Sequence, residues 1–547
     1  MRRTRGNKRY SRKEKYCTMA NLLYDTSSYT EERFPLPKAD IDFEKELFEA
    51  ANRMRGSIAP ADYKHVVLPL IFLRYVSVRF DQRRSELIQM VRDPKSDWFT
   101  DDPQIQQVIL ADPDQYRAER VYILPPESHW SFLVQNAKQP NIKELIDQAM
   151  KKLEEANPSL VGVLPRIYQS SNLPSENLAS LIEIFSRDIF FNPESSIDVL
   201  GRVYEYFIGN FANSEGSRGG EFFTPASIVK LLVAMLEPME GTVFDPACGS
   251  GGMFIQSEMY TPNKHALSFY GQESIDQTIR LGKMNILLHG IDAEIRQGDS
   301  LLQDQYADQK FDFVISNPPF NQKLWGADRV SKQDPRLIGP ITDGNANYMW
   351  IQHFLHHVKP GGTAGFVMAN GAMTTNTTGE KEVRQRLVEE GYVDCIVQMP
   401  EKLFFTTGIP CALFFLSKSR NGEKGFRQRK DEILFIDARK KGSMVSRKQK
   451  VLAHEEIHEI AEIYHSFKTV DSEYEDVAGL CKVVNLEKVI KNDYKLTPGI
   501  YVGTEVGEDE DIRFEEKMAQ LTGQLRTQFE ESNRLQVRIL RNLEEWF

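Results

Sequence analysis

One predicted strand ends on four residues that could bind and activate an amino group. Residues 311–322 read FDFVISNPPFNQ, so an apolar run meets Asn317, Pro318, Pro319 and Phe320. Proline cannot continue a sheet ladder, so the strand should stop there and present an amide, a free carbonyl and an aromatic ring. Acceptors at Asn317 Oδ1 and the Pro318 carbonyl would draw the nitrogen of a base's amino group toward tetrahedral geometry and free its lone pair. Phe320 would stack on that base, a contact worth roughly 1–3 kcal/mol.

A glycine cluster follows a second predicted strand. The stretch 242–254 reads TVFDPACGSGGMF, and its glycines Gly249, Gly251 and Gly252 allow a sharp turn and a close approach of the backbone to a ligand. A dinucleotide fingerprint would need a third glycine at the position of Phe254. The pattern therefore disfavours a pyrophosphate cradle.

Three acidic residues stand at the ends of successive predicted strands. Asp245 suits a ligand that carries an ammonium group, as S-adenosylmethionine does. Glu273 could accept both hydroxyls of a ribose, and Asp299 could accept from an adenine amino group. One such acid alone is usually a helix cap or a solvated turn residue, but three beside a glycine loop predict a cofactor site. The sulfonium would supply the reactive methyl, and the protein would orient in-line transfer.

The elements that must position these residues lie between 196 and 420. Short apolar runs alternate there with helical patterns, which predicts a parallel sheet with helices on both faces. Such sheets bind ligands beyond the carboxyl ends of their strands, where the motifs stand. A helix is expected in PASIVKLLVAML, with Thr224 as its N-cap and Pro225 in its first turn. The expected strands are TVFD, SFYGQE, FDFVIS, TAGFVMA, VDCIVQM and CALFFLS.

The flanking regions have different patterns. Residues 1–34 begin with a strongly basic stretch and are expected to be a disordered arm. Residues 35–195 should form a separate helical domain, and residues 421–505 are mixed. Residues 506–547 predict a long helix whose apolar stripe is covered either by its own domain or by a helical partner. The two stripes comprise Phe43, Leu47, Phe48, Ala51 and Met54 near the start of the chain, and Phe514, Met518, Leu521, Leu525, Phe529, Leu535, Ile539 and Leu543 near its end.

Composition predicts an ordinary soluble protein. The chain has 547 residues, 41% of them apolar, and its longest apolar run, at 66–78, contains Pro69 and Arg74. That run is shorter than the roughly 20 residues of a membrane span. Five well-separated cysteines show neither zinc-site spacing nor a dense disulfide pattern, so we expect a cytoplasmic protein without a metal site. A formal charge of −10 argues against unaided, tight binding to nucleic acid.

The pairing of DPACGSGGM with NPPF resembles the amino-methyltransferases, and residues from about 35 to 547 resemble the methylation subunit of type I restriction-modification systems. Supporting stretches are LFEAANRMRGSIAPADYKHVVLPLIFLRYVS, RGGEFFTPASIVKLL and GIPCALFFLSK. The resemblance implies a Rossmann-like α/β methyltransferase sheet with an N-terminal helical domain and a C-terminal helical tail. It implies N6-adenine methylation of DNA and an S-adenosylmethionine pocket that includes Ser250. The same pocket would include Glu221, Phe222, Phe223, Thr224, Pro225 and Ala226.

The resemblance also implies partners: a specificity subunit, a restriction subunit that acts as translocase and nuclease, and a second copy of the methylation subunit. A physical argument agrees, because only about 65 residues separate the glycine loop from NPPF and strands and helices use them. No room remains there for a base-reading domain. We expect the loop at 321–347 to be mobile without DNA, either as a lid over a flipped base or as a plain loop.

Other interpretations of these residues stay open. Cytosine-N4 methylation uses the same amine geometry, and NPPF-like motifs also occur in much shorter enzymes that act on a protein glutamine amide. A scaffold that binds cofactor could clamp DNA without independent catalysis. Cys411 in GIPCALFF resembles the nucleophile of cytosine C5 methylation, but it enters an apolar strand, so we expect a buried structural cysteine.

Overall fold

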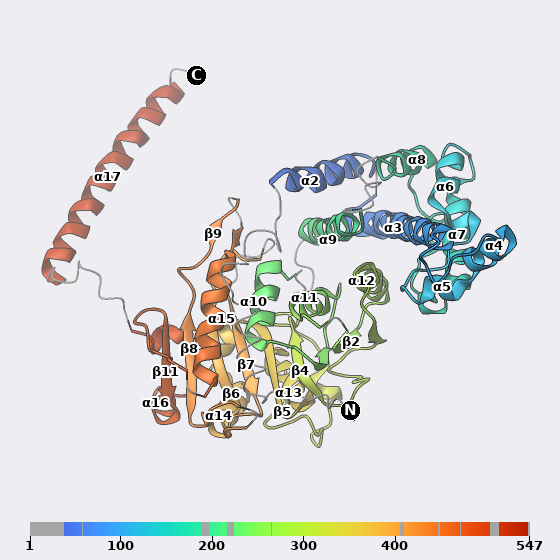
Figure 1. Ribbon diagram of the computed structural model, residues 1–547. Coiled ribbons are helices and arrows are strands. Elements are labelled where there is room, and N and C mark those ends of the chain that lie inside the picture. The colour runs from blue at the N-terminus through green and yellow to red at the C-terminus, as the bar shows by residue number, and fades with distance from the viewer. Residues whose placement is uncertain are drawn as a thin grey trace, which may run out of the picture. The chain divides into compact units, whose positions relative to one another are not determined.

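A computed structural model shows two compact units (Figure 1). One contains the described residues up to Glu215 together with Arg280–Gly290, and the other contains those of Gly216–Ile279 and of 291 onward. The predicted basic arm and the segment Glu221–Phe223 lie outside the described residues. The structure describes residues 38–56, 58–187, 196–215, 224–263, 265–404, 410–423, 425–446, 449–470, 472–503 and 514–544.

The first unit is all helical, as predicted. Leu47 and Ala51 are buried on the first helix, and Phe48 and Met54 pack against the same core, which confirms that stripe; the side chain of Phe43 is not described. The predicted boundary at 195 assigns α9 to the sheet region, whereas α9 belongs to the helical unit. The helices of this first unit are α2 (Lys38–Arg53), α3 (Pro60–Arg92), α4 (Pro103–Ala111), α5 (Pro113–Arg117), α6 (Trp130–Asn136), α7 (Ile142–Ala156), α8 (Ser175–Ile184) and α9 (Ser196–Glu215), together with the part of α12 (Asp276–Leu288) from Arg280 onward. Short 3-10 turns lie at Pro126–Ser128 and Pro158–Leu160.

The second unit is built on a nine-stranded sheet in the order β11-β8-β6-β7-β5-β4-β1-β2-β3. Its strands are β1 (Gly241–Asp245), β2 (Leu267–Glu273), β3 (Ala293–Gln297), β4 (Phe311–Ser316), β5 (Val358–Ala369), β6 (Val393–Gln398), β7 (Cys411–Ser417), β8 (Glu432–Asp437) and β11 (Cys481–Asn485). All six predicted strands are present. A separate antiparallel pair is formed by β9 (Ser443–Met444) and β10 (Lys450–Val451).

The sheet is parallel where the predicted site residues lie. β1 pairs in parallel with β2 and β4, and β2 with β3, so the carboxyl ends of these strands meet at one edge. The expectation of a wholly parallel sheet is wrong at β7, which runs antiparallel between β5 and β6. The strands β8 and β11 lie in the predicted mixed region and extend this same sheet.

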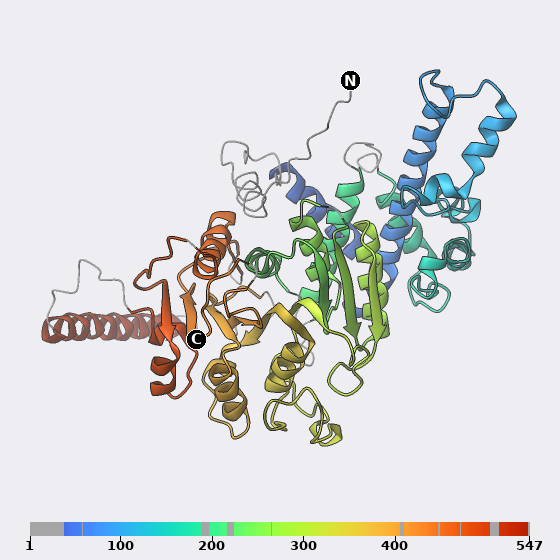
Figure 2. The same cartoon turned by 60° about the horizontal axis from the view of Figure 1, so that its bottom comes forward.

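Helices cover both faces of the sheet, as Figures 1 and 2 show: α10, α11 and α15 lie on one face, and α13 and α14 lie on the other. None of the described helices combines the length and apolar character needed to cross a lipid bilayer. The helices that follow α9 are α10 (Ala226–Leu236), α11 (Gly252–Tyr260), α12 (Asp276–Leu288), α13 (Asn347–His357), α14 (Glu380–Glu389), α15 (His454–Lys468), α16 (Leu486–Lys491) and α17 (Phe514–Glu544), with 3-10 turns at Ala327–Arg329, Asn370–Met373 and Pro498–Ile500.

Candidate functional site

The neighbouring ends of β1 and β4 carry the first predicted site residues. Asp245 ends β1 and is 2% exposed, and its Oδ1 accepts from the Ser316 hydroxyl at 2.6 Å and from the Ala247 N–H at 3.0 Å. Burial raises the pKa of Asp245 to about 7, although both hydrogen bonds oppose the rise and the charge of Glu273 adds to it. A cation bound here would stabilise the carboxylate. Because Ser316 directly precedes Asn317, this contact ties the predicted catalytic motif to β1.

The glycine loop lies against the end of β2. Cys248 N donates to the Gln272 carbonyl at 3.1 Å, and Gly249 N donates to Glu273 Oε2 at 3.2 Å. β2 permits this approach because Gly271 has no side chain: a Cβ there would lie 2.9 Å from Cys248 Sγ. The structure therefore brings the glycine loop and Glu273 together, as the sequence predicted.

The same loop opens α11 beside open space. Gly251 is the N-cap and has φ +78°, a left-handed conformation that residues with a side chain rarely adopt. A Cβ at Gly252 would meet no heavy atom within 4 Å, and Ser250 is partly exposed next to it. Unpaired N–H groups at a helix start bind carboxylates well. Together with Asp245 they suit a ligand that carries both the ammonium and the carboxylate of an amino acid.

The other two predicted acceptors, Glu273 and Asp299, also stabilise local turns. Glu273 Oε1 accepts the N–H groups of the next two residues at 2.8 and 3.0 Å. Asp299 Oδ1 accepts those of Leu301 and Leu302 at 3.0 and 3.2 Å. These bonds engage Glu273 Oε1, which also accepts from the Ser274 hydroxyl at 3.2 Å, and Asp299 Oδ1. The remaining acceptor capacity for a ligand therefore lies on Glu273 Oε2 and Asp299 Oδ2.

The amide of Asn317 is oriented by a residue far away in sequence. Its Nδ2 donates to Thr224 Oγ1 at 2.8 Å, so Oδ1 is the acceptor of this amide. The prediction that Thr224 caps α10 is wrong, because Pro225 is the N-cap and α10 begins at Ala226. The Thr224 hydroxyl instead joins the segment before the glycine loop to the NPPF motif.

The ring of Phe320 is buried and presents no open face on which a base could stack. Its ring is 5% exposed and meets Phe404 edge to face, with ring centroids 5.6 Å apart. Pro318 is buried and Pro319 is partly exposed. Stacking of Phe320 on a base therefore stays a prediction, and it requires the ring to turn toward the base.

The loop at 321–347 is packed, which argues against a mobile lid. Trp325 is buried, and its indole N–H donates to the Thr342 carbonyl at 3.1 Å. Asn347, at the start of α13, accepts from Asn321 N at 3.0 Å and donates its own Nδ2 to Asn321 Oδ1 at 2.8 Å. Both ends of the loop are thereby fixed to α13 and to each other.

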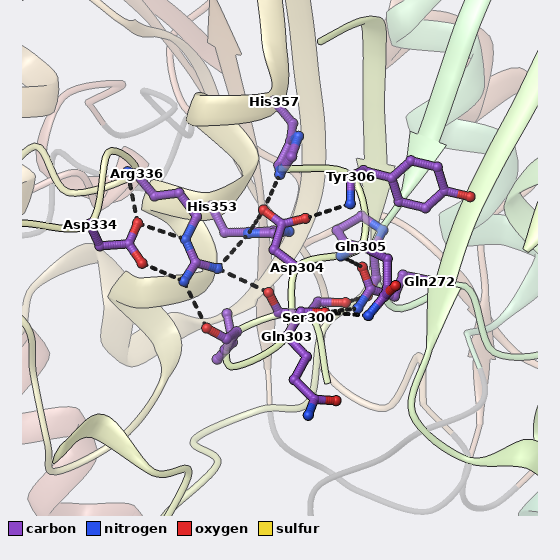
Figure 3. A network of polar contacts seen from close by, with 12 residues as sticks. Gln272, Ser300, Gln303, Asp304, Gln305, Tyr306, Asp334, Arg336, His353 and His357 are labelled. Atoms are coloured by element: carbon purple, nitrogen blue, oxygen red, sulfur yellow. Dashed lines mark hydrogen bonds and ion pairs between the residues drawn. The ribbon is translucent and has the colours of Figure 1, made fainter. Parts of the chain in front are cut away.

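Arg336 joins this loop to the turn that carries Asp299. The guanidinium is buried, forms an ion pair with Asp334 at 2.7 Å, and donates to the carbonyls of Ser300 and Leu301 at 3.0 and 2.8 Å (Figure 3). Such charge-assisted bonds fix the turn more firmly than neutral ones. Arg336 could not be identified from the sequence, because nothing there pairs it with Ser300.

Two further residues of the network fix the same turn from the sheet side (Figure 3). Gln272 donates to the Gln303 carbonyl at 2.8 Å and accepts from Gln305 N at 3.1 Å. The hydroxyl of Ser300 donates to the Pro246 carbonyl at 2.6 Å. Gln272 and Ser300 were not predicted as site residues either, and the only signal for each in the sequence is that it adjoins a predicted acid.

Asp304, His353 and His357 place three possible metal-ligand atoms within 4.8 Å of one another. Hydrogen bonds, however, already engage all three residues. His357 contacts the Gln309 carbonyl through Nδ1 at 2.9 Å and the Asp304 carboxylate through Nε2 at 3.0 Å. Arg336 donates to His353 Nδ1 at 3.2 Å, and burial with the nearby positive charges holds the pKa of His353 well below its usual value. The group is a buried polar network beside a cation, a poor setting for a metal ion.

Cys411 has no access to a base. It is 1% exposed at the start of β7, and burial raises the pKa of its thiol to about 12. A thiol held protonated inside the sheet is a poor nucleophile. The prediction of a buried structural cysteine is confirmed.

Comparisons with known proteins agree with this geometry. The family model for N-6 DNA methylases matches residues 195–510, and that for the HsdM N-terminal domain matches residues 43–185. The type I restriction enzyme MjaIX methylase subunit of Methanocaldococcus jannaschii is 40% identical over 511 residues, which cover 91% of this chain and 90% of the relative. The HindI methylase subunit of Haemophilus influenzae is 40% identical over 417 residues, 74% of this chain and 92% of the relative.

A solved structure supports the fold. The type I restriction-modification methyltransferase subunit from Streptococcus thermophilus matches with a TM-score of 0.71 over 85% of this chain and 100% of that chain, at 24% identity. The first family model spans the whole sheet from β1 to β11, and therefore the glycine loop and NPPF. The chain accordingly belongs to the N-6 DNA methylase family, as a methylase subunit of the type I restriction-modification kind and an adenine-specific DNA methyltransferase.

Proposed function

We propose that this chain transfers a methyl group from S-adenosylmethionine to N6 of an adenine turned out of DNA, at a sequence read by a separate specificity subunit. The observation that carries the proposal is the hydrogen bond from Asn317 Nδ2 to Thr224 Oγ1 at 2.8 Å. This bond sets which side of the amide accepts a hydrogen. The acceptor then stands at the end of β4, beside Asp245 at the end of β1.

The residues around the glycine loop fit the cofactor chemically. When bound, S-adenosylmethionine supplies an electrophilic methyl group on a sulfonium sulfur. Asp245 would hold its ammonium, and the backbone N–H group at Gly252 would hold its carboxylate. The N–H of Gly251 already donates to the Cys248 carbonyl at 2.8 Å, so Gly251 serves the turn of the loop. Glu273 would accept from the ribose hydroxyls, and Asp299 from the adenine amino group. The proposed pocket also includes Gly249, Ser250, Thr224, Pro225 and Ala226. Glu221, Phe222 and Phe223 remain proposed members that lie outside the described residues.

The amino group of the target base must be activated before it can attack the methyl group. The lone pair of N6 is delocalised into the adenine ring, so the amine is a poor nucleophile. Asn317 Oδ1 and the Pro318 carbonyl would accept its two hydrogens and localise the lone pair on nitrogen. Pro319 would hold the turn, and Phe320 would leave its contact with Phe404 to stack on the base. No general base is required, because the methylated, charged amine loses its proton readily.

Charge and the layout of the sheet support a separate partner that reads the DNA, whereas the restriction subunit and the second copy rest on the similarity to type I methylase subunits. The formal charge of −10 leaves the chain poorly suited to hold DNA tightly by itself. Between the glycine loop and NPPF the chain forms α11, β2, α12, β3 and β4, which leaves no segment for reading bases. We propose that a specificity subunit reads the DNA, that a restriction subunit joins the same complex, and that the complex contains a second copy of this chain.

Methylation sequencing of the host genome, with and without this gene, tests the proposal. We expect N6-methyladenine at one sequence motif to disappear on deletion and to return when the gene is restored. Restoring the gene without the specificity subunit should not bring back the modification. Loss of N4-methylcytosine instead, or an unchanged methylome, would contradict the proposed function.

A further inference from the structure

One apolar side chain beside the proposed site is wholly exposed. Leu324 is 100% exposed, whereas every other large apolar side chain that is exposed in the described residues lies between 37 and 68%. It also has φ +53°, a left-handed conformation that is unfavourable for leucine. At this position, folding therefore buries no apolar side chain and leaves the backbone in an unfavourable conformation. A residue held in a strained conformation without a packing contact is a candidate for function.

The structure fixes Leu324 between two anchors. On one side, Asn321 is bonded to Asn347 and Gln322 Oε1 accepts from the Trp350 indole at 3.3 Å. On the other side, the buried Trp325 is bonded to the loop backbone. Since both neighbours are held, the exposed side chain of Leu324 stands on a rigid support.

That support lies at the carboxyl end of β4. Leu324 follows Asn317 by seven residues, and a Cβ added at Gly326 would lie 3.0 Å from the side chain of Leu302. Leu302 belongs to the turn whose N–H groups bind Asp299. The loop therefore begins at the NPPF motif and contacts the turn that carries Asp299. DNA must come close to the NPPF motif if its base is to reach Asn317.

The charges of the same loop suit DNA, in contrast to the chain as a whole. Lys323, Arg329 and Lys332 are exposed, and the exposed acids of the loop are Asp328 and Asp343. Cations that flank an exposed apolar side chain can contact phosphates on either side of a base step. This combination distinguishes Leu324 from an apolar residue waiting for a protein partner.

We propose that Leu324 inserts into the DNA base stack and fills the gap left by the target adenine. The inference rests on the proposed function, since only an enzyme that extrudes a base leaves such a gap. Leucine is among the side chains that enter base steps as wedges, because its apolar surface replaces part of the lost stacking. Leu324 is thus a positioning residue: it stabilises the extruded state and touches no reacting atom.

The test uses the complex with the specificity subunit and the variant Leu324→Gly. Glycine tolerates the positive φ, so the thermal stability of this variant should equal or exceed that of wild type. With 2-aminopurine at the target position, its fluorescence on binding should be clearly lower than with wild type, since fewer bases are extruded. Methyl transfer to a normally paired duplex should fall about tenfold or more.

A second duplex separates a wedge from a structural role. When the target adenine faces an abasic site, its pairing is already lost, so Leu324→Gly should act within about twofold of wild type on that duplex. Val161→Ala, which shortens an exposed apolar side chain in the helical unit, should match wild type on both duplexes. Equal activity of Leu324→Gly and wild type on the paired duplex, or equal losses on both duplexes, would overturn the wedge. Failure of wild type to methylate either duplex would instead overturn the proposed function.

Discussion

At the end of β1, a buried carboxyl group titrates close to neutral pH. Burial raises the folded-state pKa of Asp245 to about 7, so between about pH 4 and 7 the folded chain binds more protons there than the unfolded chain does. The contribution of Asp245 to stability therefore falls as the pH rises through that window. A bound ammonium group has the opposite preference, because it stabilises the carboxylate.

We predict that the affinity for S-adenosylmethionine rises about five- to tenfold from about pH 6 to 7.5, as Asp245 ionises. The amino group of the ligand stays mostly charged over this range, since such groups titrate at roughly 7.7–8.0. Titration calorimetry on wild type and Asp245→Asn measures the effect. The variant should bind S-adenosylmethionine more weakly, and its affinity should not depend on pH over this range. Parallel pH profiles for the two proteins would rule out this role for Asp245.

Two glycines, one on β2 and one at the start of α11, give a matched pair of variants. Gly271→Ala should destabilise the protein by about 1–3 kcal/mol, because the new Cβ would lie 2.9 Å from Cys248 Sγ and push the glycine loop off β2. Gly252→Ala meets open space at the start of α11, so it should leave stability unchanged or slightly higher. It should nevertheless weaken cofactor binding. Denaturant unfolding measures the stability of the two variants, and calorimetry measures their affinity for the cofactor. An equal loss of stability in both variants would refute the close approach of the glycine loop to Gly271.

Arg336 gives a prediction about the turn that it anchors. Arg336→Ala removes a buried ion pair and two bonds to carbonyls, which should cost about 3–5 kcal/mol in the free energy of unfolding. Arg336→Lys should retain only part of this stability, because the lysine ammonium lacks the planar, paired N–H donors of the guanidinium. If the turn positions Asp299, the lysine variant should raise the KM for cofactor more than it lowers kcat. Arg329→Ala, an exposed cation of the same loop, is the control and should match wild type in stability.

Much of the sheet and of the site could be predicted because the signals are local. Asp245, Glu273 and Asn317 stand at strand ends, and parallel strands bring those ends together. The antiparallel direction of β7 could not be predicted, since a fully buried apolar run carries no sign of direction. Thr224 was misplaced for a related reason. Its partner, Asn317, is distant in sequence, whereas capping rules consider only neighbours.

For the whole molecule, α17 leaves an apolar surface to be covered. Side chains of the predicted stripe are between 45 and 60% exposed where they are described: Met518, Leu525, Phe529, Leu535 and Ile539. The described structure therefore provides no cover for them from the rest of the chain. An exposed apolar seam on a long helix indicates a helical partner in another chain.

We predict that the double variant Leu525→Asp, Phe529→Asp fails to assemble with the specificity subunit. Its melting temperature as an isolated chain should not change, because both side chains are exposed. Thr527→Asp adds a charge on the opposite face of α17 and should assemble normally. Light scattering coupled to size exclusion measures the complexes, and assembly of the double variant at wild-type affinity would show that the stripe serves another contact.

The rate of methyl transfer by Asn317→Ala in the assembled complex measures whether Asn317 activates the amine. Single-turnover transfer from labelled S-adenosylmethionine to a target duplex should fall at least about a hundredfold, because the amine loses an acceptor that acts in the transition state. The affinity for cofactor should stay within about twofold of wild type, since Asp245 and the glycine loop are intact. Asn317→Asp keeps an acceptor oxygen and should retain measurable transfer. Transfer by Asn317→Ala at the wild-type rate, with cofactor binding intact, would contradict the account.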